Sequence, residues 1–141
     1  MHSRRFSTGP LLLLSTLCLC AAGCSGSDGP QRYRLSGEVT YDGKPVPYGW
    51  IVFTPEQGPG ASANIENGRY ETPEGFGSVG GQHTIEVVAF DGVATPDPEI
   101  EGVTNPAGSP MFTYTFKQDI PKGLESWDIE ISSEDVQQQK R

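Results

Sequence analysis

From residue 33 onward, short runs in which apolar and polar residues alternate follow one another, separated by turn signals. The first run extends from Tyr33 to Tyr41 with apolar residues at alternate positions, the period of a half-buried β-strand. Asp-Gly at 42–43 and Asn-Gly at 67–68 are dipeptides typical of tight hairpin turns. No run shows a helical period. Seven strands are predicted: residues 33–41, 49–55, 61–66, 69–72, 82–90, 111–116 and 124–131.

Seven short antiparallel strands in about 100 residues predict an all-β fold, a seven-stranded antiparallel β-sandwich. The run 49–55 is apolar on both faces between Trp50 and Phe53, which predicts a central place in the sheet. Gly37 interrupts the apolar face of the first strand and indicates either a bulge or a close approach of another backbone.

One long segment separates the last strands from the others. Residues 91–110 are rich in Pro, Gly and acidic side chains, and we expect a structureless loop that is either mobile or functional. The last residues, after the final strand, are polar and are expected to fray. The predicted organisation is a signal peptide (1–23), a flexible tether (24–32), a β-sandwich domain (33–133) and a polar C-terminal tail (134–141).

The N-terminus has the three-part layout of a secretory signal peptide. Arg4 and Arg5 precede an apolar run from Leu11 to Leu19, and small residues follow. The run is shorter than the roughly 20 apolar residues of an ordinary transmembrane helix. General secretion is favoured over the twin-arginine route, because polar residues at 7–8 follow soon after the arginine pair.

The three cysteines have different interpretations. Cys18 and Cys20 lie within the apolar run, would leave with the signal peptide, and behave there as small hydrophobes. "AAGC", which ends at Cys24, resembles the lipobox of bacterial lipoproteins, and this resemblance implies lipid attachment at Cys24 after cleavage before it. The alternative is an ordinary signal peptide that leaves a free thiol. A lipidated Cys24 would anchor the protein to a membrane. Ser25 after it, instead of aspartate, favours export to the outer membrane over retention in another periplasm-facing membrane.

Charge and ligand types exclude several function classes. The net charge is −8 and the ten basic residues are scattered, which argues against nucleic acid as a partner. No second cysteine half-site accompanies Cys24, so a zinc site is not expected. Asp97, Glu99 and Glu101 alternate in the long loop, where a calcium site is the alternative to solvated carboxylates. We expect no metal and no cofactor.

The chain from residue 33 to 132 resembles a known family. Three motifs carry this resemblance: G-x-V-x-x-x-G-K-P-V (37–46), I-x-F-x-P (51–55) and N-G-x-Y (67–70), and "DIPKGLESWDIEIS" matches the closing segment. They resemble the carboxypeptidase regulatory-like, transthyretin-like domains, and more narrowly the small secreted lipoproteins of Planctomycetes. The resemblance implies a Greek-key sandwich of the prealbumin type without catalytic residues. Such turn and core motifs specify a fold better than a function.

The sequence predicts a non-enzymatic protein. Only His83 would remain as a histidine after cleavage, and its place within a strand predicts a packed side chain rather than a catalytic base. We expect a lipid-anchored protein of the cell envelope with a structural or protein-interaction role. The alternative is a carbohydrate-binding module, whose candidate ligand contacts are Tyr48, Trp50 and Phe76, since these aromatic residues adjoin loops.

Overall fold

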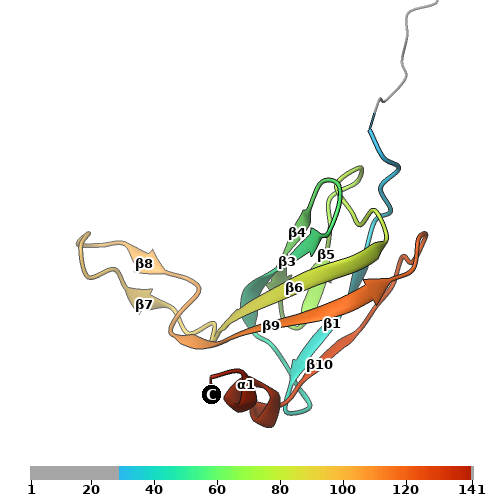
Figure 1. Ribbon diagram of the computed structural model, residues 1–141. Helices are drawn as coiled ribbons and strands as arrows, with labels where there is room; N and C mark the ends of the chain where they lie inside the picture. Colours follow the sequence, from blue (N-terminus) through green and yellow to red (C-terminus); the bar gives the residue numbers. More distant parts are fainter. Residues whose placement is uncertain (1–28, 141) are drawn as a thin grey trace, which may run out of the picture.

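The computed structural model describes residues 29–140, which fold around one curled β-sheet that forms a half-barrel (Figure 1). The order across the sheet is β10-β1-β5-β4-β3-β6-β9, and the short β2 pairs with β1. These strands are β1 (Ser36–Tyr41), β2 (Lys44–Pro45), β3 (Tyr48–Pro55), β4 (Ala61–Glu66), β5 (Arg69–Glu71), β6 (Gly81–Phe90), β9 (Pro110–Ile120) and β10 (Ile129–Ile131). Each predicted strand overlaps one of them, so the prediction of a mostly β fold is confirmed.

The antiparallel prediction is wrong for one pair of strands. β10 runs parallel to β1, with Val39 opposite Ile129 and Tyr41 opposite Ile131. The alternation of apolar residues shows which face of a strand is buried, but it does not show the direction of the neighbouring strand. The remaining ladders of the main sheet are antiparallel. β3 lies between β4 and β6, as its predicted central place requires.

The two predicted tight turns form as expected. Asp42 and Gly43 have φ values of 48° and 76°, and Asn67 and Gly68 have φ values of 52° and 78°. Positive φ at both central residues is the geometry of a two-residue hairpin turn whose twist matches that of the strands. The Asn67-Gly68 turn joins β4 to β5 and so fixes the register of the hairpin that borders the candidate site.

The core fills the inner face of the curl. Ile51 and Phe53 of β3, Ile85 and Val87 of β6, and Val39 of β1 are fully buried there. Alternate residues of the same strands face solvent, so only one of the two apolar faces of β3 is buried. Gly37 allows the close approach that the sequence suggested, because a Cβ there would overlap the backbone carbonyl of Trp127.

The segment 91–110 is not structureless. It contains a two-stranded sheet of β7 (Thr95–Pro96) and β8 (Thr104–Asn105), which projects from the body of the fold as an arm (Figure 1). The side chain of Asp91 holds its base, accepting hydrogen bonds from the backbone amides of Val93 and Ser109, both at 2.9 Å. Such local side-chain bonds organise a polar, Pro- and Gly-rich segment that has no apolar period.

The expectation of a frayed tail without a helix is also wrong. α1 (Ser133–Gln139) begins with a capping box, in which the Ser132 hydroxyl accepts from the Asp135 amide and the Asp135 carboxylate accepts from the Ser132 amide. The Ser132 hydroxyl also donates a 2.6 Å hydrogen bond to the Asp135 carboxylate, and this bond and, to a smaller extent, the bond from the Ser132 amide lower the pKa of Asp135. Val136 is buried against the core. Within residues 29–140, no helix has the length and apolar character needed to cross a membrane.

Candidate functional site

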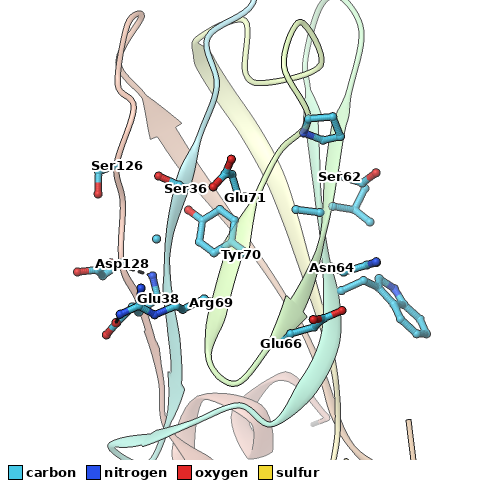
Figure 2. Close-up of a pocket in the computed structure, with 15 residues that line it drawn as sticks. Ser36, Glu38, Ser62, Asn64, Glu66, Arg69, Tyr70, Glu71, Ser126 and Asp128 are labelled. Carbon is cyan, nitrogen blue, oxygen red and sulfur yellow. Dashed lines mark hydrogen bonds and ion pairs between the residues drawn. The ribbon is translucent and has the colours of Figure 1, made fainter. Parts of the chain in front are cut away.

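An open groove of about 1280 Å³ lies where β4 and β5 separate (Figure 2). The two strands pair only next to their turn, through Ile65 with Tyr70 and Glu66 with Arg69. Beyond this point β5 continues beside β1, while β4 continues beside β3. The groove is lined by Ser36, Gly37, Glu38, Trp50, Val52, Ser62, Ala63, Asn64, Glu66, Arg69, Tyr70, Glu71, Pro73, Ser126 and Asp128.

The wall formed by β4 offers polar groups to the groove. Ser62 and Asn64 are exposed and alternate with the buried Ala61 and Ala63. Within residues 29–140, no strand pairs with β4 on its β5 side beyond Ile65. Backbone groups of consecutive strand residues point alternately to the two sides, so this side of β4 retains donors and acceptors for a ligand or water.

Three of the five charged residues that line the groove, Glu38, Arg69 and Glu71, form ion pairs. Arg69 lies 3.3 Å from a carboxylate oxygen of Glu38, and Arg34 forms an ion pair with Glu71. Oδ1 of Asp128 accepts a hydrogen bond of 2.8 Å from the Glu38 amide. These exposed contacts order the groove surface more than they stabilise the fold, since exposed ion pairs contribute on the order of 0–1 kcal/mol.

Tyr70 lies at the floor of the groove and is almost fully buried. Its hydroxyl donates a 2.8 Å hydrogen bond to the carbonyl oxygen of Trp127. Burial, and to a smaller extent the negative charge of Asp128, raises the pKa of Tyr70 well above its ordinary value. A tyrosine held neutral in this way ties β5 to the segment before β10 and is unsuited to act as a base.

Two of the three predicted ligand contacts are the exposed aromatic side chains of the fold. Trp50 lines the groove with 39% of its surface exposed and packs on Phe90 at a centroid distance of 5.1 Å. Phe76 is 60% exposed. Tyr48 is half-buried on the same face of β3 as Trp50 but does not line the groove. A ligand-binding role for these three residues stays a prediction.

Phe76 lines a second, smaller hollow of about 330 Å³. The two hollows share Val52, Ser62 and Pro73, so they adjoin along the same surface. Together they form one continuous surface, with Trp50 in the larger hollow and Phe76 in the smaller one.

Arg32 orders the end of this surface next to Phe76. Its guanidinium carbon lies 5.3 Å from the centroid of the Phe76 ring, a cation–π arrangement. It also donates hydrogen bonds to the carbonyl oxygens of Gly77 (3.1 Å), Phe76 (3.0 Å) and Gly60. Arg32 falls in the predicted tether (24–32), because one arginine in a polar stretch carries no signal of such contacts.

His83 is packed, as predicted, and it contacts a serine that the sequence analysis did not identify. His83 is 2% exposed and Ser78 is 3% exposed, and Nε2 of the histidine lies 3.3 Å from the serine hydroxyl. Nδ1 of His83 lies 2.7 Å from the carbonyl oxygen of Gly81. Neither residue lines the two hollows, so this pair is inaccessible to a substrate and serves to satisfy buried polar groups.

One of the alternating acids of the long segment, Asp97, holds backbone amides. Oδ1 of Asp97 accepts from the amides of Glu99 (2.8 Å) and Ile100 (3.0 Å). Across residues 29–140, no three carboxylate, histidine or cysteine side chains gather as a metal site would require. Cys24, the predicted lipid attachment site, lies outside the described residues, as do Cys18 and Cys20.

Comparisons with known proteins add no relative: no family model, curated protein or solved structure matches the chain.

Proposed function

We propose that this chain is a lipid-anchored, non-catalytic binding protein of the cell envelope, attached through Cys24 to the outer membrane or another periplasm-facing membrane. The observation that carries the binding role is the continuous surface between Trp50 and Phe76. Glu38, Arg69 and Glu71 of this surface are held in ion pairs, its tyrosine is neutral, and the histidine of the fold is buried elsewhere. A surface with this set of side chains favours ligand binding over nucleophilic or acid–base catalysis.

We further propose that the curled sheet is a transthyretin-like sandwich. This proposal is supported by the structural roles of residues in the motifs that carry the resemblance. Gly37, which opens the first motif, provides the space for the Trp127 backbone, and Asn67-Gly68 of the third motif forms the hairpin turn beside the groove. A sandwich of this kind presents variable surface features on a constant core, so the fold itself does not determine the ligand.

The anchor is tested by detergent partitioning of the full chain purified from its own cells. Several acyl chains on Cys24 would each contribute about 0.8 kcal/mol per buried methylene, so we expect the protein in the detergent phase after cloud-point separation of Triton X-114. The same chain made without its signal segment is the control and should remain in the aqueous phase. Recovery of both proteins in the aqueous phase would contradict the anchor.

A glycan is the second candidate ligand, and the exposed Trp50 favours it. A flat aromatic ring beside exposed Ser62 and Asn64 combines a stacking surface with hydrogen-bonding side chains. With cellohexaose and chitohexaose as probes, isothermal titration calorimetry measures binding in every variant, and in the unaltered chain binding should also change the fluorescence of Trp50. Trp50→Ala should weaken that binding about tenfold or more, whereas Met111→Ala, at an equally exposed apolar residue outside both hollows, should leave it unchanged. Binding that survives Trp50→Ala excludes this candidate site.

A further inference from the structure

We propose that the arm, residues 91–109, is a docking element for a partner protein that presents an apolar cleft rimmed by Lys and Arg side chains. Three of the exposed large hydrophobic residues in the described chain belong to the arm: Val93 (63% exposed), Ile100 (57%) and Val103 (45%). Apolar side chains gathered on one projecting element mark an interaction site more often than isolated exposed ones do. Figure 1 shows the arm extending away from the sheet, so the body of the fold does not cover it.

The arm is organised although it packs on no core. At its base, the amides of Asp91 and Gly92 donate to the carbonyl oxygens of Ser109 and Ala107, both at 3.0 Å. Near the tip, the Asp97 amide donates to the Val103 carbonyl oxygen at 2.8 Å. The Asp97 carboxylate, which holds the Ile100 amide, fixes the backbone that presents this side chain. An element held in one conformation before binding loses less entropy when it docks.

Charge defines the rim of the partner. The arm carries Asp91, Asp97, Glu99 and Glu101 and no Lys, Arg or His. Glu99 and Glu101 flank Ile100 directly, so any cleft that receives Ile100 brings its rim beside two carboxylates. A cationic rim is attracted to this arrangement and an anionic one is repelled. A second copy of this chain is disfavoured by the same argument, because its net charge is −8.

The position of the arm argues against the membrane and against the chain's own N-terminus as the occupant. Phe90, just before the arm, pairs with Tyr48, whereas the Arg32–Phe76 hollow includes Thr54 at the other end of β3. Six residue-to-residue steps along β3, from Tyr48 to Thr54, separate these two ends by about 20 Å. Residues 24–28 would span at most about 17 Å when fully extended, so they cannot reach the arm from Gly29. The base of the arm therefore lies at the end of β3 remote from the proposed anchor.

The test is site-specific photo-crosslinking of the full chain in the cells that produce it. A benzoylphenylalanine replaces Val103 in the arm, and in the control it replaces Phe76, an exposed apolar residue in the hollow that includes Thr54, at the opposite end of β3. We expect one protein adduct from position 103 that position 76 does not form. Ile100→Ser, and separately Glu99→Lys with Glu101→Lys, should each lower the adduct yield about tenfold or more. Glu56→Lys with Glu74→Lys, the matched reversal at exposed carboxylates outside the arm, should leave the yield unchanged.

Each result decides the proposal. Raising the ionic strength from about 0.05 M to about 0.5 M should weaken the adduct of the unaltered arm, since the carboxylates are exposed. The docking proposal would be overturned if position 103 formed no specific adduct, or if its adduct were with lipid or with a second copy of the chain. It would also be overturned if the adduct yield were unchanged by the charge reversal at Glu99 and Glu101. Unchanged thermal melting of each purified variant establishes that the arm, and not the fold, was altered. The outcome is separate from those of the anchor and glycan tests, because a protein adduct at position 103 reports neither detergent partitioning nor sugar binding.

Discussion

The side-chain amide of Gln139 pairs with both backbone hydrogen-bonding groups of Thr115. Its Oε1 accepts a 2.9 Å hydrogen bond from the Thr115 amide, and its Nε2 donates a 2.6 Å hydrogen bond to the Thr115 carbonyl oxygen. Thr115 lies in β9, the edge strand of the main sheet. One glutamine thus replaces a neighbouring strand at this point and attaches α1 to the open side of the half-barrel. Covered edges resist pairing with other chains.

Replacing Gln139 with alanine should loosen α1 and expose this edge. We expect a loss of about 1 kcal/mol from the free energy of unfolding, because the two bonds are exposed and partly replaced by water. The amide of Thr115 should also exchange with solvent faster. Urea unfolding and hydrogen exchange measure the two effects. Gln138→Ala, one residue earlier and equally exposed, is the matched control. Equal stability and exchange in both variants would show that the Gln139 pairing has no structural role.

Gly37→Ala should destabilise the fold more strongly. The added Cβ would overlap the Trp127 carbonyl and approach Cε1 of Tyr70 to 3.1 Å, and a backbone held by strand pairing cannot easily move away. Overpacking of this kind costs about 1–3 kcal/mol. Gly29→Ala is the control, because a Cβ there has no neighbour within 4 Å. The midpoint of urea unfolding should fall for Gly37→Ala alone, and equal midpoints would refute the close approach.

Tyr70 should make stability fall at alkaline pH. Its pKa is raised in the folded state, so the folded chain retains a proton that the unfolded chain loses above about pH 10. The contribution of this group is complete below that pH and is lost as the pH rises further. Tyr70→Phe should cost about 1 kcal/mol near neutrality through the lost bond to Trp127, and should make the alkaline decline shallower.

Urea titrations from about pH 8 to about pH 11 test this prediction, since the range brackets the ordinary tyrosine pKa. Part of the decline will remain in Tyr70→Phe, because burial also raises the pKa of Tyr114. Tyr48→Phe, at a half-buried tyrosine that does not line the groove, serves as the control and should decline like the unaltered chain. A decline that is equally steep in Tyr70→Phe would contradict the assignment.

The strands and their turns were predictable because the information for them is local. The period of two from Tyr33 to Tyr41 and the Asn67-Gly68 turn each depend on residues close in sequence. The parallel pairing of β1 with β10 joins Val39 to Ile129, 90 positions apart, and no local pattern records it. α1 was missed for another reason: with one buried residue, Val136, it presents no apolar period, and its capping box is its only sequence signal.

The candidate site was only partly predictable. Trp50 and Phe76 were proposed because they adjoin loops, and both are exposed. The groove itself arises where β4 and β5 separate after two residue pairs, which depends on their different neighbours in the sheet. The Ser78–His83 contact depends on the chain folding back between Gly80 and Gly81, both with positive φ. The sequence shows the two glycines, but it does not show that the turn they form brings the Ser78 and His83 side chains into contact.

The most direct test of the anchored-protein proposal is metabolic labelling with radioactive palmitate. The full chain and its variants Cys18→Ser, Cys20→Ser and Cys24→Ser would be expressed in the cells that produce the protein, and each would be recovered by immunoprecipitation. We predict that the unaltered chain and the first two variants carry the label and sediment with membranes, whereas Cys24→Ser loses both properties. Label that persists in Cys24→Ser, or that is absent from the unaltered chain, would contradict a lipid-anchored protein.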